Sequence, residues 1–231
     1  MINSKNELHF IFLTFRSFIS FNVKKIFFWF FNGHFFKKKK IHEYLNSNNK
    51  KKLHLGFTKK IDGFLNSQIL GEVPLDVTRK LPFKDDTFDT IYSSHLIEHI
   101  HRKQIEFFLM ESYRILKKDG MNIISTPSVH KIFDICFKSS DKKKIFTEFS
   151  KKFYDDGGIS NSHIINLSMR AFGHRFLIER EYIKDLSKRI GYRKCSELSI
   201  NEIPDEKIRA YIKKHKPKRW ILETSNFMIQ K

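Results

Sequence analysis

The chain has 231 residues, of which 40% are hydrophobic and 25 are phenylalanine. This composition excludes an intrinsically disordered chain, and the length allows one α/β domain with a buried core and a short appendage. The two cysteines, Cys136 and Cys195, are far apart and form no CxxC pair. Their spacing excludes a disulfide framework and a zinc knuckle and favours a reducing compartment. Because we find no secretory signal peptide, we expect a cytoplasmic protein.

The formal net charge is +19, and its distribution separates the first 60 residues from the rest. Residues 1–60 carry 13 Lys and Arg against two acidic residues, or +11, whereas the other 171 residues carry 31 against 23, or +8. Within residues 8–36, bulky apolar runs are broken by Arg16 and by Lys24–Lys25, and Lys37–Lys40 follow. We therefore predict a basic, Phe-rich, helical N-terminal extension over residues 1–45.

The apolar runs of this extension are shorter than the ~18 uncharged residues of a spanning helix, so no transmembrane helix is expected. Three interpretations of the extension remain. Aromatic side chains beside a lysine cluster are typical of a helix on an anionic membrane, so residues 8–40 are one candidate for peripheral contact at the inner face of the membrane. The second interpretation is a helix that packs on the following domain. Nucleic-acid binding is the weakest, because no RNP, KH or helix-turn-helix pattern accompanies the basic residues.

From residue 51 onward, short apolar runs alternate with turn residues and with helical spacing. Strands are predicted at 51–55, 64–69, 88–93 and 121–125. A helix is predicted at 102–117 with Gly120 as its C-terminal cap, and another before Gly191. The second helix directs Ile183, Leu186 and Ile190 inward. Residues 219–231 are predicted to form a closing strand or hairpin. Residues 128–160 are interpreted as an insertion or lid within a domain spanning 46–231.

Strands that alternate with helices predict βαβ units, and hence an α/β fold with a mostly parallel sheet and helices on both faces. Ligands of such sheets bind beyond the C-terminal ends of the strands. Polar residues gather at these predicted ends: Gly56, Gln68, Asp76, Ser93, Ser94 and His95.

Six stretches occur in a recognisable order: LHLG, GFLN, LDVT, LPFKDDTFDTIYSSHLIEHI, FLMESYRILKKDGMNIISTP and INLSMRAFGHRFL. This order resembles the class I S-adenosylmethionine (SAM)-dependent methyltransferases. More narrowly, it resembles a small bacterial subfamily, methyltransferase type 11-like, that is associated with surface-polysaccharide genes. The resemblance covers about residues 45–195, and Leu81–Pro127 is its specific part. It implies a seven-stranded Rossmann-like sheet, SAM as cofactor and methyl transfer to a sugar, glycolipid or related cell-envelope precursor.

The resemblance also implies a cofactor site, position by position. The glycine turn that wraps the methionine part of SAM falls on residues 56–58. The acid that grips the ribose hydroxyls falls on Gln68, and the acid that faces the adenine falls on Asp76. The end of the fourth strand, next to the reactive methyl group, falls on Ser94 and His95. The expected cofactor-binding residues are Gly56, Phe57, Thr58, Gln68, Asp76, Ser93 and Ser94.

Two positions depart from the family pattern. Family members have Gly-Cys-Gly where this chain has Gly56-Phe57-Thr58, and a β-branched residue is strained where a glycine takes a positive φ. Gln68 offers one neutral acceptor, whereas a carboxylate accepts two charge-assisted hydrogen bonds from a ribose diol. Together these losses reduce SAM affinity by roughly 10–100-fold or more. The alternative function is therefore a catalytically inactive protein of this fold that acts as a binding or membrane-associated partner.

The stretch His95 to His99 matches the H-x-x-E-H pattern of one zinc metalloprotease class, with Glu98 as the general base. We do not adopt this interpretation, because His95 directly follows a strand and no specific third ligand is evident downstream. Asp85, Asp86 and Asp89 are interpreted as turn residues before a strand and not as a metal loop. We therefore predict no metal site.

His95 is the candidate general base, because the pKa of histidine lies near the operating pH. A pocket-lining role for His95 is the alternative. The stretch after the insertion carries His163, Arg170 and His174 around Gly173. We expect these three residues to bind the acceptor, since an Arg and two His suit an anionic or sugar-phosphate group. A purely structural segment is the competing interpretation.

Overall fold

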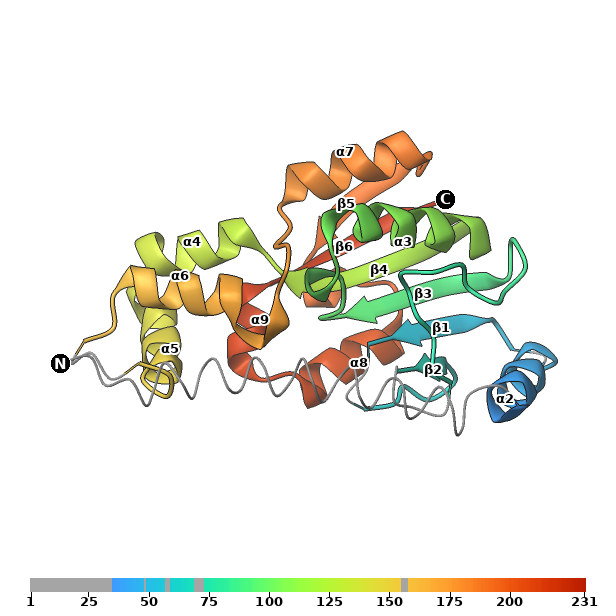
Figure 1. The fold of residues 1–231 in the computed structure, drawn as a ribbon, viewed down its shortest axis with the longest axis horizontal. Helices are drawn as coiled ribbons and strands as arrows, with labels where there is room; N and C mark the ends of the chain where they lie inside the picture. Colours follow the sequence, from blue (N-terminus) through green and yellow to red (C-terminus); the bar gives the residue numbers. More distant parts are fainter. Residues whose placement is uncertain (1–34, 48, 57–58, 69–72, 155–157) are drawn as a thin grey trace.

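The computed structural model describes residues 35–47, 49–56, 59–68, 73–154 and 158–231. Its centre is a six-stranded sheet with the strand order β2-β1-β3-β4-β6-β5 (Figure 1). Strands β1 to β4 run parallel, and β6 is antiparallel to both of its neighbours. The strands are β1 Lys52–Leu55, β2 Leu65–Ser67, β3 Phe88–Ser94, β4 Leu116–Pro127, β5 Lys194–Leu198 and β6 Thr224–Gln230.

The predicted α/β, Rossmann-like, mostly parallel sheet is confirmed, but the predicted number of seven strands is wrong for the described residues. Residues 73–81, which follow β2 in the chain, form bends and a turn instead of a further strand. In that turn the Asp76 carboxylate accepts hydrogen bonds from the backbone N (3.1 Å) and the hydroxyl (2.6 Å) of Thr78. This side-chain-to-backbone bonding competes with ladder pairing, as is typical of Asp.

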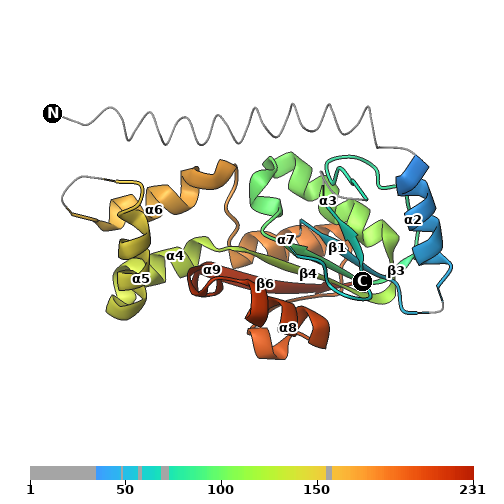
Figure 2. The ribbon, with the colours of Figure 1, turned by 90° about the horizontal axis from the view of Figure 1, so that it is seen from below.

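Helices cover both faces of the sheet, as predicted (Figure 2). The face that carries Leu53, Ile91 and Ile124 packs against α3 and α7. On the other face, Tyr92 and Ile123 pack against α8. Ile61 and Phe64 belong to the same second cluster. The helices are α2 Phe35–Leu45, α3 Arg102–Ile115, α4 Val129–Lys138, α5 Ser140–Ser150, α6 Asn161–Arg170, α7 Arg180–Ile190, α8 Glu206–His215 and α9 Lys218–Glu223.

The predicted C-terminal end of α3, with Gly120 as its cap, is wrong. The helix ends at Ile115, and Leu116 already pairs with Phe88 as the first residue of β4. Gly120 is therefore inside β4 and is not a helix cap. A Cβ at this position would lie 2.8 Å from the Lys117 carbonyl oxygen, so the glycine permits a close backbone approach.

The other helix-end prediction is confirmed. Helix α7 ends before Gly191, which takes the left-handed conformation with φ +111°. Ile183 and Leu186 are fully buried, and Ile190 packs against the same core. A left-handed residue directly after a helix satisfies the last carbonyl groups, and glycine adopts it at little steric cost.

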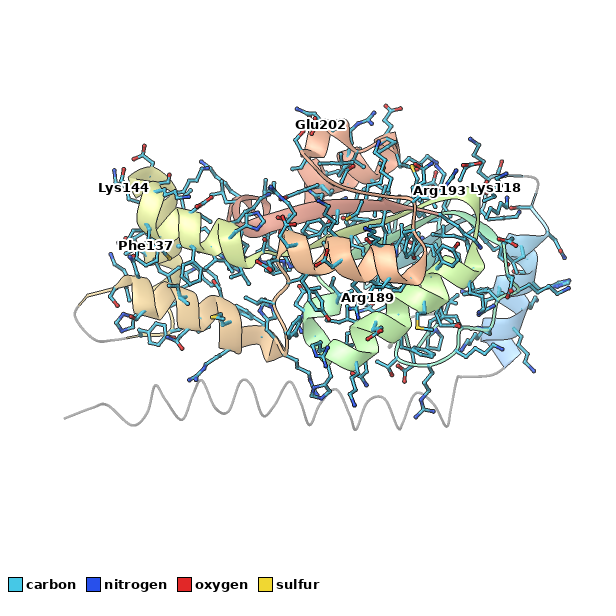
Figure 3. All side chains as sticks on the ribbon, turned by 90° about the horizontal axis from the view of Figure 1, so that it is seen from above. Lys118, Phe137, Lys144, Arg189, Arg193 and Glu202 are labelled. Carbon is cyan, nitrogen blue, oxygen red and sulfur yellow. The ribbon has the colours of Figure 1, made fainter. Side chains whose placement is uncertain are left out.

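Helices α4, α5 and α6 form a layer that extends away from the sheet (Figures 1 and 2). Helices α4, α5 and α6 share a small apolar cluster of Ile135, Cys136, Phe146 and Ile164. Figure 3 shows Phe137 and Lys144 at the far end of this layer, remote from Lys118 and Arg193 at the other end of the molecule. The segment interpreted from the sequence as an insertion or lid therefore contains regular helices with a core of their own.

The described part of the N-terminal extension is α2, which packs against the sheet. Ile41 joins the main core, and the Tyr44 hydroxyl donates a hydrogen bond to the Lys52 carbonyl at 2.8 Å. No helix within the described ranges is long and apolar enough to cross a membrane. Most of the stretch predicted to contact a membrane, up to residue 34, lies outside the described residues.

The predicted closing strand is confirmed only in its second half. Residues 218–223 form α9, and β6 begins at Thr224 and then pairs with both β4 and β5. As a result α9 lies beside the C-terminal end of β4, where Ser128 N donates to the Glu223 carbonyl at 2.9 Å. The C-terminal segment therefore contributes side chains to the edge of the sheet that carries the candidate site.

Candidate functional site

The topology of the sheet contains one switch point among its parallel strands. The chain passes from β1 outward to β2, and from β3 in the opposite direction to β4, while β1 and β3 are neighbours. Ligands of α/β sheets bind at the carboxyl ends of the strands where the direction of winding reverses. In this chain those ends are Gly56 after β1 and Ser94 at the end of β3.

Gly56 has the backbone of a glycine turn, with φ +71°. A Cβ on this residue would lie 2.9 Å from Leu96 Cδ1 and 3.3 Å from the Ser94 carbonyl oxygen. Position 56 therefore requires glycine on two counts, the positive φ and the lack of space. Phe57 and Thr58, the other two residues of the expected turn, lie outside the described residues.

Gln68 follows directly at the end of β2, and its side chain is exposed. Gly56 N donates to the Ser67 carbonyl at 3.2 Å, so the structure brings the ends of β1 and β2 together as predicted. Asp76 is held differently. Its carboxylate accepts from Thr78 and lies 3.5 Å from Arg79 Nε, so its oxygens already have partners within their own turn.

Ser93 and Ser94 are buried at the end of β3, next to the switch point. Ser93 is opposite Leu55 in the ladder with β1. Its hydroxyl has no hydrogen-bond partner within the described part of the chain. A buried, unpaired hydroxyl beside a glycine turn fits a site that receives a polar ligand group. The glycine turn, the exposed Gln68 amide and the Ser93 hydroxyl thus suit the binding of SAM. The Asp76 carboxylate is already hydrogen-bonded to Thr78.

His95 is held rigidly on the other side of the β3 end. Its backbone takes φ +49°, and its ring stacks on Trp220 with the ring centres 4.4 Å apart. Nδ1 lies 3.2 Å from Glu98 Oε1, and Nε2 lies 3.0 Å from Thr224 Oγ1. A proton on Nδ1 would face this carboxylate, which only accepts, and would leave the lone pair of the neutral ring on Nε2. Any proton abstraction by His95 therefore takes place at Nε2, next to Thr224.

A small cavity borders this ring. Its volume is about 10 Å³, close to the space that one water needs. Ser94, Lys216 and Asn226 contribute polar groups to its wall, and Trp220 contributes an aromatic face. Burial lowers the pKa of Lys216 to about 8, an effect that the charge of Glu98 partly opposes. Sequence reasoning missed Lys216, Trp220 and Thr224, because they lie over 120 residues after His95 and share no motif with it.

Glu98 is the most deeply buried charged group at this edge, with no exposed surface. Its Oε2 accepts from the Thr126 hydroxyl at 3.0 Å. Burial raises the pKa of this carboxyl, but the imidazole rings of His95, His99 and His174 outweigh that effect and lower the pKa to about 2. Glu98 is therefore an ionised carboxylate at neutral pH.

The H-x-x-E-H stretch does not adopt the geometry of a zinc protease helix. The 3-10 helix η1 covers only Ile97–His99, and His95 precedes it with a positive φ. His95 and His99 are therefore not one turn apart on a common α-helix, as expected from the sequence. Glu98, the general base of that pattern, instead accepts a hydrogen bond from Thr126 and lies 3.2 Å from His95 Nδ1.

The three predicted acceptor-binding residues do not form one group. His163 bonds to the backbone N (3.0 Å) and hydroxyl of Ser160 and so closes the N-terminus of α6. Arg170 is exposed at the other end of α6, about 10 Å along the helix. His174 turns back toward η1, where its ring lies 5.0 Å from that of His99.

A larger hollow of about 530 Å³ lies at the opposite edge of the sheet, beside the N-terminal ends of β1 and β3. Its charged side chains are largely paired: Lys52 lies 2.6 Å from Asp205, and Lys117 lies 2.9 Å from Asp89. Parallel sheets bind their ligands at the carboxyl ends of the strands, so the smaller cavity beside His95 is the better candidate despite its size.

Comparison with known proteins gives a match in sequence. Residues 60–124 match a family model described as a methyltransferase domain. This segment contains Gln68, Asp76, Ser93, Ser94 and His95, but not Gly56. No curated protein matches the chain.

Solved structures of similar shape include a SAM-dependent methyltransferase from Archaeoglobus fulgidus, with 13% identity and a TM-score of 0.46 over 84% of this chain and 90% of that one. Another is a SAM-dependent methyltransferase from Thermotoga maritima, with 14% identity and a TM-score of 0.45 over 95% of this chain and 99% of that one. The family match, placed on a Rossmann-like sheet with a glycine turn at its switch point, supports SAM as the cofactor of this chain.

Proposed function

We propose that this chain is a SAM-dependent methyltransferase that acts on a sugar, a glycolipid or a related precursor of the bacterial cell envelope. The observation that carries the proposal is the methyltransferase-domain match over residues 60–124, which ends in β4 and so includes the end of β3 at the switch point. SAM would supply an electrophilic methyl group on its sulfonium. What the chain must supply is alignment of the acceptor and removal of its proton.

The cofactor would be held along the ends of β1, β2 and β3. Gly56 would keep the backbone open at the turn, and the exposed Gln68 amide would bond to a ribose hydroxyl. The unpaired Ser93 hydroxyl offers a further hydrogen bond. We include Phe57, Thr58, Asp76 and Ser94 among the cofactor-binding residues on the resemblance alone.

His95 would remove the proton of the acceptor through Nε2. Glu98 fixes the ring and stabilises the imidazolium that forms, since its carboxylate lies 3.2 Å from Nδ1. The acceptor hydroxyl has to take the place of the Thr224 hydroxyl, which lies 3.0 Å from Nε2. We keep His163, Arg170 and His174 as separate proposed contacts of the acceptor, and Arg170 has the most exposed side chain of the three.

A second candidate is a non-catalytic protein of the same fold. Asp76 favours it, because the carboxylate expected at the adenine already accepts two hydrogen bonds from Thr78. Gln68 favours it as well, because the ribose has lost its acidic partner. In this alternative, residues 8–40 would attach the protein to the inner face of the membrane. Lys38 and Lys39 of α2 are exposed and available to anionic lipid, whereas Lys37 and Lys40 are half-buried.

The deciding experiment is calorimetric titration of the full chain with SAM and with S-adenosylhomocysteine. It compares the wild type with Gln68→Asp, and Asn201→Asp is the control, because it adds the same charge at an exposed position of the 3-10 helix η3, Ile200–Glu202. We expect micromolar binding by the wild type. Gln68→Asp should bind about tenfold more tightly, because a charged acceptor replaces a neutral one, and Asn201→Asp should bind like the wild type.

Binding recovered only in Gln68→Asp would support the non-catalytic alternative, and no binding in any variant would reject the enzyme. Where the wild type binds, transfer of a labelled methyl group from SAM to sugars, sugar phosphates and glycolipids identifies the acceptor class. A His95→Gln variant that binds SAM normally but transfers the label at an unchanged rate would remove His95 from the mechanism.

A further inference from the structure

Three potential metal ligands converge beside the candidate site. Glu98 and His99 come from η1, and His174 comes from the segment after α6, 75 residues later in the chain. One ligand atom from each residue lies within 4.8 Å of the others. Two imidazole rings and one carboxylate form a donor set that suits a divalent transition metal, and Zn²⁺ is commonly bound by it with one position left open.

The backbone fixes these three residues relative to one another. Both Arg175 N and Phe176 N donate to the Glu98 carbonyl, at 2.7 and 3.3 Å. The segment that carries His174 is therefore attached directly to the residue that supplies the carboxylate. Gly173 takes φ +78°, which favours glycine, and a Cβ on it would be in ordinary van der Waals contact with His99 Nδ1 at 3.9 Å, so the turn lies beside the His99 ring.

The His174 ring has the tautomer that a metal ligand needs. Its Nδ1 donates to the Ser168 carbonyl at 2.7 Å, which leaves the lone pair on Nε2. Metal-binding histidines usually donate their second ring nitrogen in this way to a backbone carbonyl or a carboxylate. Glu98 is oriented similarly, since Thr126 donates to Oε2 and His95 lies beside Oε1.

The burial of Glu98 also requires a neighbouring positive charge. Its side chain has no exposed surface, and within the described ranges no lysine or arginine nitrogen lies within 4.0 Å of its carboxylate. A buried carboxylate is costly unless charges or hydrogen bonds compensate it, and here the His95 ring and the Thr126 hydroxyl do so in part. A metal ion between Glu98, His99 and His174 would supply this charge.

We propose that Glu98, His99 and His174 bind one divalent transition-metal ion, of which Zn²⁺ is the best match. Donors around a tetrahedral Zn²⁺ lie about 3.3 Å apart, so the three side chains close by on the order of 1 Å when the ion binds. The site differs from the H-x-x-E-H arrangement, because Glu98 is a ligand, His95 orients Glu98, and His174 completes the set. The ion would tie the loop after β3 to the segment that leaves the α4–α6 layer, and the inference does not depend on SAM.

The test uses the full chain, freed of metal with a chelator and titrated with Zn²⁺ against a chromophoric competitor. His99→Gln and His174→Gln each remove one ligand. His163→Gln is the matched control, because His163 lies on the nearby α6 but bonds to Ser160 instead of the cluster. Co²⁺ titration gives a second measurement, since the visible absorption of Co²⁺ reports its coordination.

We expect one Zn²⁺ per chain, with affinity reduced at least about 100-fold in His99→Gln and His174→Gln and unchanged in His163→Gln. The ring of His99 is half-buried, and no hydrogen bond of that ring occurs in the described structure, so His99→Gln should keep the fold; circular dichroism of the metal-free variants checks this. No stoichiometric binding would overturn the proposal. Binding that is lost in His163→Gln, or that is equal in all variants, would show adventitious surface histidines only and would also overturn it.

Discussion

Leu96 occupies the space into which a side chain at Gly56 would project. A Cβ built on Gly56 would meet Leu96 Cδ1 at 2.9 Å and Leu96 Cβ at 3.0 Å. Gly56 follows β1 and Leu96 follows β3, so the two residues pack against each other beside the switch point of the sheet. The glycine turn is therefore required by the fold itself, whether or not a ligand binds beside it.

Gly56→Ala should lower the free energy of unfolding by about 2 kcal/mol. The alanine must adopt a positive φ, which costs about 1–2 kcal/mol, and its Cβ must displace Leu96. Urea unfolding of the full chain measures the change. Gly158→Ala is the control, because no atom of the described residues lies within 4 Å of a Cβ there, and it should stay within about 0.5 kcal/mol of the wild type. Equal effects of the two substitutions would contradict the described turn.

His54 should make the protein sensitive to mild acid. It is buried in β1, stacked on Tyr92 with the ring centres 5.1 Å apart. Burial lowers the pKa of His54 to about 4, an effect that its hydrogen bond to Asn66 partly opposes and that Lys216 reinforces. The unfolded chain takes up this proton near pH 6.5 and the folded chain only near pH 4, so stability is lost as the pH falls through that window. The loss approaches about 3 kcal/mol.

His54→Phe removes the titration and keeps an aromatic ring against Tyr92. The free energy of unfolding, measured by urea at several pH values between 7 and 4, should fall less steeply for this variant than for the wild type. His101→Gln is the control, since it removes a histidine at an exposed position. A slope that His54→Phe leaves as steep as before would assign the acid sensitivity to another group.

Much of the sheet and its main helices could be predicted from the sequence, because their signals are local. The apolar run of β3 and the spacing of Ile183 and Leu186 on α7 each indicate one element within a few residues. Gly191 was predicted correctly, because a glycine directly after a helix has one common role. Gly120 was not, because Leu116 pairs with Phe88 in the ladder, and that tertiary contact ends the helix early.

The candidate site could be predicted only in part. The positions of Gly56, Gln68 and Ser94 follow from the rule that parallel strands end at one edge of the sheet. The partners of His95 do not, because Thr224 and Trp220 reach it only through the antiparallel return of β6 and the short helix α9. The same holds for His174, which was expected in an acceptor site with His163 and lies instead beside His99.

Arg114 lies within residues 60–124, which match the methyltransferase-domain model. We nevertheless expect it to act on the stability of the fold and not on cofactor binding. Its guanidinium bonds to Glu111 at 2.7 Å, to Asp85 at 2.8 Å and to the carbonyls of Phe83 and Leu81. It thus fastens the turn before β3 to helix α3.

Arg114→Lys should lower the free energy of unfolding by about 1–2 kcal/mol, because a lysine cannot reach several acceptors in a planar fork. Arg189→Lys, at an exposed position of α7 (Figure 3), should have no measurable effect. The comparison is made by urea unfolding at one pH. Unaltered SAM binding in Arg114→Lys, after correction for stability, would confirm that the residue acts through the fold. A stable Arg114→Lys variant with lost SAM binding would instead place Arg114 in the site.

Glu223 should make the stability depend on pH in the direction opposite to that of His54. It lies 2.8 Å from Arg219, whose guanidinium is 4.2 Å from the ring centre of Phe149. Burial raises the pKa of Glu223 to about 7, although Arg219 opposes the change and Glu98 reinforces it. The folded chain therefore keeps this proton over a range in which the unfolded chain, with a pKa near 4.5, has lost it. The stabilisation is complete below pH 4.5 and is lost as the pH rises through about 7.

Glu223→Gln cannot ionise, so its free energy of unfolding should decline less than that of the wild type between pH 5 and pH 8, by up to about 3 kcal/mol. Arg219→Met removes the cation that favours the carboxylate, so its stability should decline more steeply than that of the wild type. Glu148→Gln, at an exposed position of α5, is the control. If the stability of Glu223→Gln and of the wild type declines in parallel, Glu223 is ionised across this range. The Arg219–Glu223 pair is then a buried ion pair at every pH tested, and Arg219 joins α9 to the α4–α6 layer.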